Sequence, residues 1–216
     1  MASDGRRQRK GEGTVTRDAI LAAARELFLT LGYTQTTVRG IVARVGVTPP
    51  VLYRYFRDKD DILFEVADDA FRKLETAFRA ALAEAPESLD ALRRMMEAYV
   101  RFGLTHPDEY RFVFMSRELV PPSVTHRPSQ DVAAPKGQRG ATCFRLLEDL
   151  VARLTAAGHL RPGDPALHAE LIWAAGHGLV ALLISHPNFP WREREDLIRG
   201  MVDLPLEGLL PRNDPA

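Results

Sequence analysis

The side chains whose chemistry is easiest to interpret lie close together, between Thr37 and Lys59. The hydroxyl groups of Thr37, Thr48 and Tyr53 can each donate a hydrogen bond, and Arg39 and Lys59 add two positive charges. Groups of this kind bind anions, phosphate oxygens in particular, and they do not pair a nucleophile with a base. The stretch therefore indicates recognition of an anionic partner rather than catalysis.

The rest of the chain offers little for an enzyme. Ser116, His126 and Asp131 lie in a proline-rich stretch that fixes no geometry among them, and the motifs Gly-x-Ser-x-Gly and His-Glu-x-x-His do not occur. Cys143 is the single cysteine, so it forms no internal disulfide and lacks partners for a zinc site. We predict that the protein is not an enzyme and holds no metal and no cofactor.

The charge of the chain is divided between two regions. Residues 1–59 hold eleven Lys and Arg against five Asp and Glu, and the remainder holds 18 against 24. The basic end suits a polyanion that the acidic remainder would repel, although a chance shift in composition is the alternative. The N-terminus lacks the apolar core of a secretory signal, and the most apolar stretch, Leu171 to Ile184, falls short of the roughly 20 residues of a membrane span. We expect a cytoplasmic protein that contacts no membrane.

Apolar residues recur at three- and four-residue steps along most of the chain, and strand alternation does not stand out, which predicts an all-α fold. The first helix begins after Thr14 or Thr16 and ends at Gly32, the second follows Thr36 and ends at Gly46, and the third begins after Thr48. Further helices are expected over residues 58–85, 88–104, 107–115, 140–157, 164–185 and 191–202. Residues 116–140 contain four prolines without a period and are expected to form a mobile loop.

Two short helices joined by VGVT, with a packing helix before them, have the parts of a helix-turn-helix. In that arrangement the second short helix enters the major groove of DNA. The longer string TTVRGIVARVGVTPPVLYRYFRDKDDIL, residues 36–63, closely resembles the DNA-binding head of the TetR family. The resemblance is carried by Thr37, Ile41, Gly46, Val47, Thr48, Leu52, Tyr53, Tyr55, Phe56 and Lys59. It implies that Tyr53 and Lys59 contact phosphates, with a packed ring and a solvated hydroxyl as the alternative for Tyr53.

Base reading is less simple, because Pro49, Pro50 and Val51 open the third helix and none of them can make a bidentate hydrogen bond to a base. Apolar contacts with thymine methyl groups remain open to them. Arg39 corresponds to a place from which some members of the family reach a guanine, and a solvated or phosphate-bound arginine is the alternative. Tyr55 is a further candidate. The basic arm before residue 14 either enters the minor groove or is only a solubilising tail.

The second part of the chain carries the motif WAAGHG, Trp173 to Gly178, which resembles the WHG-type C-terminal domain of a branch of the same family. Trp173 and His177 share one helix face and are expected to line a ligand cavity, or else to pack as a core pair. His168 lies about half a revolution away, which disfavours a joint metal site. The other expected ligand contacts, each with a core role as the alternative, are Met95, Tyr99, Phe102, Phe112, Phe114 and Phe144.

We therefore predict a flexible basic arm over residues 1–13, a helix-turn-helix DNA-binding domain over 14–60, with the motif at about 37–56, and a helical ligand-binding and dimerisation domain over 61–210. The expected function is that of a transcriptional regulator, a homodimer on a pseudo-palindromic operator of double-stranded DNA. We expect a repressor that a small apolar or aromatic effector releases. A ligand-binding helical dimer with weak or lost DNA binding is the alternative.

Overall fold

The structure is a computed structural model that describes residues 10–84, 87–115 and 139–211. Within these residues it is helical throughout its regular elements, so the all-α prediction is confirmed. The helices are α1 (Lys10–Gln35), α2 (Val38–Val45), α3 (Pro49–Tyr53), α4 (Lys59–Glu84), α5 (Leu89–Thr105), α6 (Pro107–Tyr110), the π-helical turn η1 (Arg111–Met115), α8 (Arg139–Ala156), α9 (Pro165–Ser185) and α10 (Arg194–Leu209). Residues 116–138, where we predicted a mobile loop, lie outside the described residues.

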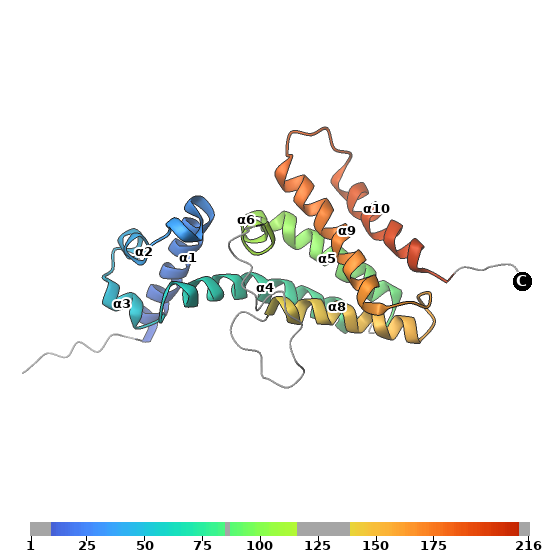
Figure 1. Ribbon diagram of the computed structural model, residues 1–216, viewed down its shortest axis with the longest axis horizontal. Coiled ribbons are helices and arrows are strands. Elements are labelled where there is room, and N and C mark those ends of the chain that lie inside the picture. Colours follow the sequence, from blue (N-terminus) through green and yellow to red (C-terminus); the bar gives the residue numbers. More distant parts are fainter. Residues whose placement is uncertain (1–9, 85–86, 116–138, 212–216) are drawn as a thin grey trace, which may run out of the picture.

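Helices α1 to α3 form a small head at one end of the molecule, and α5, α8, α9 and α10 form a larger body at the other (Figure 1). The long helix α4 begins in the head and continues into the body, where α8 lies along it. Helices α9 and α10 lie side by side on the far side of the body from α4 (Figure 1). One helix therefore belongs to both parts and can carry a movement between them.

The core of the head, which we call the head cluster, comes from four helices and one residue of η1. Its fully buried members include Ile20 of α1, Ile41 of α2 and Leu52 of α3. Ile62 and Val66 of α4 close one side of it. Because α2 and α3 have only eight and five residues, they depend on this packing rather than on their own helix propensity.

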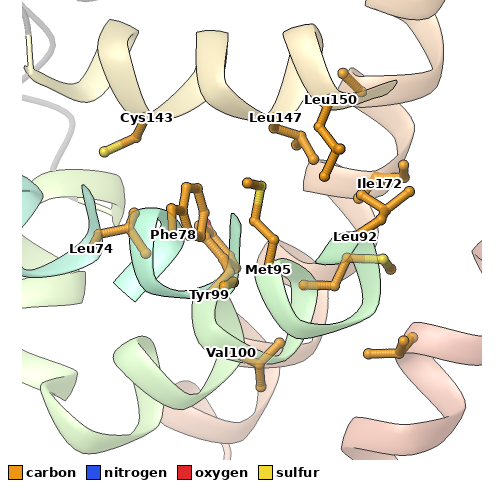
Figure 2. Packing of buried hydrophobic residues seen from close by; sticks show 14 of the residues in the cluster. Leu74, Phe78, Leu92, Met95, Tyr99, Val100, Cys143, Leu147, Leu150 and Ile172 are labelled. Carbon is orange, nitrogen blue, oxygen red and sulfur yellow. The ribbon is translucent and has the colours of Figure 1, made fainter. Parts of the chain in front are cut away.

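The core of the body, which we call the body cluster, is formed between α4, α5 and α8, with α9 and α10 packed on α5. Figure 2 shows Cys143, Leu147 and Leu150 of α8 facing Leu74, Phe78 and residues of α5. Helices α5 and α9 cross closely at Gly103, where a Cβ atom would lie 2.4 Å from a methyl carbon of Val180. A larger residue at this crossing would push the two helices apart.

Several predicted helix bounds need correction. Helix α1 begins at Lys10, inside the stretch expected to be a flexible arm, and it continues past the expected end at Gly32, which forms a kink with φ +78°. The expected helix 107–115 is divided into a short α-helix and a π-helical turn. Helix α10 extends to Leu209 rather than 202, because its buried stripe continues through Leu206 and Leu209 on either side of the internal Pro205.

Helix α9 is longer and more apolar than the stretch considered from sequence. It has 21 residues, and its most apolar window has a mean hydropathy of 1.5, so length and composition alone would allow it to cross a membrane. The sequence argument that the stretch is too short is therefore wrong. In the fold, α9 packs on α5, α8 and α10 as a core helix of the body does, and 33% of the apolar window is buried. Packing within the body does not account for the exposed leucines of α9, which are Leu167, Leu171 and Leu182.

Candidate functional sites in the head and the body

The turn between α2 and α3 is held by local backbone bonds. The hydroxyl of Thr37 accepts a hydrogen bond from the backbone N–H of Gly40 at 3.1 Å and so caps the start of α2. Gly46 ends α2 in the left-handed conformation, with φ +76°, and its N–H bonds to the carbonyl of Val42 at 2.9 Å. A residue with a Cβ atom would be strained at Gly46. This turn fixes the angle at which α3 leaves the head.

The residues predicted to meet DNA lie at the surface on this pair of helices. Thr37, Arg39, Thr48 and Pro50 are exposed, while Pro49, Val51 and Tyr55 are half-buried. The ring of Tyr53 is 54% exposed, so it does not pack in the core as the alternative for this residue required. Thr48 caps α3 without a side-chain hydrogen bond to the helix. The two prolines remove backbone N–H groups from the first turn of α3 and leave it fewer donors for an anion.

Lys59 has a role that the sequence did not reveal. Its ammonium group donates to the backbone carbonyls of Tyr33 at 2.8 Å and Thr36 at 2.9 Å, and it lies 3.9 Å from the centre of the Tyr33 ring. The hydroxyl of Tyr33 in turn donates to Asp60. Lys59 thus ties the end of α1 to the start of α4, and an ammonium group has three N–H donors, which leaves one for a phosphate.

The body encloses a cavity of about 710 Å³ among α4, α5, η1, α8, α9 and α10. Six of the residues predicted to contact a ligand line it, namely Met95, Tyr99, Phe114, Phe144, Trp173 and His177. Phe71, Leu74, Phe78 and Leu147 supply much of the remaining wall. A mostly apolar cavity of this size fits a small organic molecule.

Two predicted ligand contacts need correction, because Phe102 and Phe112 do not line this cavity. Phe102 is buried in the body cluster and lies against the ring of His106, 5.5 Å between centres. Phe112 is 1% exposed and packs in the head cluster, with its ring stacked on that of Phe28 at 5.9 Å. The sequence placed Phe112 near Phe114 correctly, but the π-helical turn directs the two rings to different cores.

A line of hydrogen bonds runs along the cavity wall. Nε1 of Trp173 donates to the hydroxyl of Tyr99 at 3.0 Å, which lies 2.9 Å from the hydroxyl of Tyr110, and that group lies 2.7 Å from Nδ1 of His177. Burial raises the pKa of Tyr99 to about 12 and also raises the pKa of Tyr110, so both stay protonated. Burial lowers the pKa of His177. Trp173 and His177 therefore line the cavity, and each also has a hydrogen-bond partner within the protein.

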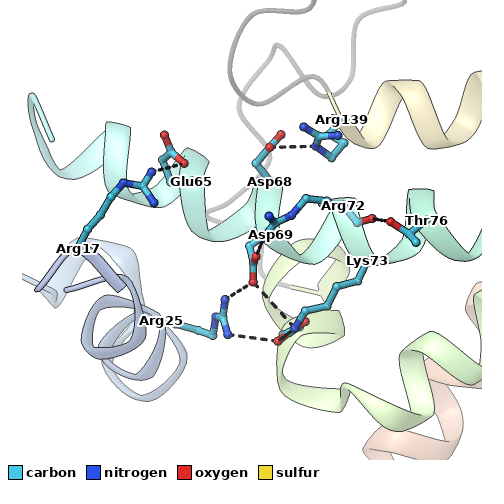
Figure 3. Close-up of polar contacts among 10 residues, drawn as sticks. Arg17, Arg25, Glu65, Asp68, Asp69, Arg72, Lys73, Thr76 and Arg139 are labelled. Carbon is cyan, nitrogen blue, oxygen red and sulfur yellow. Dashed lines mark hydrogen bonds and ion pairs between the residues drawn. The ribbon is translucent and has the colours of Figure 1, made fainter. Parts of the chain in front are cut away.

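Tyr110, a buried partner of two of these cavity residues, was missed, although its signal was the aromatic run of residues 106–114. A second missed feature is a group of charged side chains, which we call the ion network, between the head and the body (Figure 3). Arg25 of α1 pairs with Asp69 of α4 at 2.8 Å and with Glu109 of α6 at 3.2 Å, and Lys73 pairs with Glu109 at 2.7 Å. These partners lie 36 to 84 positions apart, beyond any local pattern.

Burial raises the pKa of the Asp69 carboxyl, but the guanidinium groups of Arg72 and Arg25 outweigh it and hold this pKa below its ordinary value. Glu109 is 9% exposed, and its Oε2 atom has no hydrogen-bond partner among the described residues. Its charge therefore depends on Arg25 and Lys73, which approach the other oxygen. The ion network thus connects α1, α4 and α6 through ion pairs.

Comparison with known proteins assigns both parts of the chain. Residues 20–66 match the family described as bacterial regulatory proteins of the tetR family, and residues 92–204, which include the WAAGHG motif, match the tetracyclin repressor-like C-terminal domain. The chain belongs to the TetR family. Transcriptional regulators of this family bind DNA operators and are typically dimeric, and the resemblance drawn from residues 36–63 is confirmed.

Similar proteins include both activators and repressors. The HTH-type transcriptional activator FasR of Mycolicibacterium smegmatis is 25% identical over 199 residues, which are 89% of this chain and 82% of that one. The repressor BepR of Brucella suis is 37% identical over 100 residues, about half of each chain. Among solved structures, NalD of Pseudomonas aeruginosa superposes with a TM-score of 0.68 at 21% identity, over 93% of this chain and 98% of that one, which shows the shared fold.

Proposed function

We propose that this chain is a sequence-specific, dimeric DNA-binding regulator that acts in the cytoplasm and whose operator affinity changes when a small apolar or aromatic molecule occupies the body cavity. The observation that carries the proposal is a physical connection between that cavity and the helix-turn-helix. Thr37, Thr48, Tyr53 and Lys59 would position the head on phosphates, and Arg39, Tyr55 and the apolar first turn of α3 would read bases. We propose that the chain is a repressor and that the ligand lowers its affinity for the operator, so that the repressor is released.

The connection is residues 109–114, which we call the linking segment. Tyr110 and Phe114 belong to the aromatic wall of the body, with ring centres 4.8 Å apart. Between them, Phe112 enters the head cluster, and Glu109 holds Arg25 of α1. A molecule that moves Phe114 therefore acts on a short segment that contacts the head through Phe112 and Glu109. The π-helical turn at this point is of a kind often found at functional sites.

The dimer is proposed from α9 and α10. Leu167, Leu171 and Leu182 of α9 are each about half exposed, and Leu204 of α10 is 72% exposed. No atom lies within 4 Å of the position that a Cβ would take at Gly178 or Gly200, so a second pair of helices could approach closely. A four-helix contact about a two-fold axis would bury these leucines and would place the heads on half-sites about 34–36 Å apart.

The proposal is tested by selecting operators from a random duplex DNA library with the purified protein, and then measuring affinity by fluorescence anisotropy across salt concentrations. We expect the logarithm of the association constant to fall linearly with the logarithm of the salt concentration. Arg39→Ala should relax base preference, and Tyr53→Phe should weaken binding to all sequences alike. Arg153→Ala, an exposed change on α8, serves as the control and should leave both unchanged.

A second candidate is favoured by one observation, the poor polar readout of Pro49, Pro50 and Val51. It is a ligand-binding helical dimer whose head has lost DNA binding. Absence of salt-dependent binding to any duplex, together with retained binding of an apolar molecule in the cavity, would establish this second function. Monomers at micromolar concentration in sedimentation, with Leu171→Glu giving no further change, would contradict the dimer in both versions.

A further inference from the structure

Three cavity residues, Trp173, Tyr99 and His177, are joined in a line of hydrogen bonds through the buried Tyr110. The indole of Trp173 can only donate, so the oxygen of Tyr99 accepts from it. Two arrangements remain. Either Tyr99 donates to Tyr110 and Tyr110 donates to Nδ1 of His177, or His177 donates to Tyr110 and Tyr110 donates to Tyr99.

The second arrangement leaves the hydroxyl hydrogen of Tyr99 without an acceptor. Tyr99 is 6% exposed, and its hydroxyl has no polar neighbour among the described residues apart from Trp173 and Tyr110. A buried donor without a partner is strongly unfavourable, whereas the first arrangement uses every hydrogen in the line. The first arrangement is therefore favoured, and the donors point in one direction from Trp173 to His177.

This direction fixes the state of the imidazole. Because Nδ1 of His177 accepts a hydrogen bond, the neutral ring must carry its hydrogen on Nε2. Burial of His177, which lowers its pKa, also favours the neutral ring near pH 7. The ring lines the cavity, and no other partner for it is present among the described residues. The Nε2–H group of His177 is thus the last donor in the line of hydrogen bonds, and it has no acceptor among the described residues.

The rest of the wall offers few competing groups. The thiol of Cys143 lies 3.6 Å from the carbonyl of Phe71, to which it donates, and burial raises its pKa to about 12. The charged residues that line the cavity are half-buried, as Arg145 and Glu148 are, or exposed, as Glu170 is. The donor of His177 lies among apolar and aromatic wall residues such as Phe114, Phe144 and Trp173, and so it can fix the position of a bound molecule.

We propose that the cavity selects an apolar or aromatic molecule that carries one neutral hydrogen-bond acceptor, such as a carbonyl oxygen, and that Nε2–H of His177 donates to it. Trp173, Tyr99 and Tyr110 act as positioning residues that hold the imidazole in the required tautomer. The proposal rests on the proposed ligand cavity and names the chemical class of its ligand. A hydrocarbon of the same shape leaves the donor unpaired, and a cation placed at His177 has no acceptor there.

The tautomer can be measured without any ligand. In protein labelled with ¹⁵N-histidine at pH 7.5, the ring nitrogens of His177, assigned by their loss in His177→Gln, should show hydrogen on Nε2 only. Tyr110→Phe removes the donor to Nδ1 and should give a mixture of tautomers, which a merely structural role of Tyr110 would not produce. Hydrogen on Nδ1 of the unmodified protein, or an imidazolium at this pH, would overturn the proposal.

The selectivity is measured by calorimetric titration with three molecules of nearly the same shape, 2-acetylnaphthalene, 2-isopropenylnaphthalene and protonated 1-(2-naphthyl)ethylamine. We expect the ketone to bind about fivefold to tenfold more tightly than the hydrocarbon, which corresponds to one hydrogen bond. His177→Phe should abolish this ratio, His177→Gln should restore part of it, and His159→Phe, an exposed histidine outside the cavity, should leave it unchanged.

The outcomes separate the two proposals. Equal affinities for the ketone and the hydrocarbon, or a preference for the amine, would overturn the acceptor class while leaving the ligand cavity of the proposed function intact. No binding of any of the three to the unmodified protein would count against the ligand cavity, and the acceptor class would fail with it. The affinity ratio is measured on the unmodified protein, so it holds even if a His177 variant does not fold.

Discussion

The head cluster is formed by α1, α2, α3 and the start of α4, whereas the body cluster borders a cavity of about 710 Å³ and leaves leucines of α9 and α10 exposed. The two share the linking segment, because Phe112 belongs to one and Tyr110 to the other. A filled core resists deformation, and a core with a cavity can change shape when the cavity is occupied. Under the proposed function, a ligand would therefore change the shape of the body, and the head would follow through the linking segment.

The strongest way to break this comparison is Phe112→Ala. Removing a fully buried phenylalanine should lower the free energy of unfolding by about 3–5 kcal/mol, because it leaves a cavity in the filled head cluster. Phe114→Ala is the matched change on the cavity side, where the ring is only partly buried, and should lower it by about 1–2 kcal/mol. Urea unfolding at one fixed protein concentration measures both, and equal losses would mean that the two cores are equally filled.

The next prediction compares how much the ion network and a single ion pair on α4 contribute to the free energy of unfolding. Arg25→Ala leaves the buried Glu109 with Lys73 alone and should lower the free energy of unfolding by about 1–3 kcal/mol. Arg79→Ala removes an exposed arginine from Glu75 on the same helix α4 and leaves Glu75 paired with Arg139, so it should cost about 0.5 kcal/mol or less.

The same pair of variants tests the coupling between cavity and head. If the linking segment carries it, 2-acetylnaphthalene should change the operator affinity of Arg25→Ala less than that of Arg79→Ala, which anisotropy titrations would show. An undiminished ligand effect in Arg25→Ala would assign the coupling to α4 without the ion network.

A smaller effect is expected at Lys59, where two roles meet. Lys59→Ala removes two hydrogen bonds to backbone carbonyls and should lower the free energy of unfolding by about 1 kcal/mol. If its third N–H binds a phosphate, the slope of the logarithm of affinity against the logarithm of salt should also fall by about one. Arg153→Ala, an exposed change on α8, is the control for stability. An unchanged slope in Lys59→Ala would leave this residue with a structural role alone.

Lys59 also shows how far the sequence could reach. The helix-turn-helix was predictable because its caps and turn, such as Thr37 and Gly46, act within four residues of the chain. The partners of Lys59 lie 23 and 26 positions away, and those of Arg25 lie 44 and 84 positions away. No local spacing reports such contacts. Phe112 was misplaced for a different reason, because Phe112 and Phe114 are two positions apart and so face opposite sides of a helical turn, yet both were assigned to the cavity.

The smallest expected effect is a dependence on pH that distinguishes the body from the ion network. Because burial lowers the pKa of His177 in the folded protein, the unfolded chain takes up the proton first as pH falls below about 6.5, and the folded state loses stability relative to it. From pH 7 to pH 5, the unfolding free energy of the unmodified protein should therefore fall relative to that of His177→Gln, whose glutamine does not titrate.

Asp69, whose pKa is also lowered, should lose its contribution to the unfolding free energy only below about pH 3.9, and comparison with Asp69→Asn would measure this loss. Parallel curves for the unmodified protein and His177→Gln above pH 5 would mean that the imidazole of His177 is as easily protonated in the cavity wall as in water.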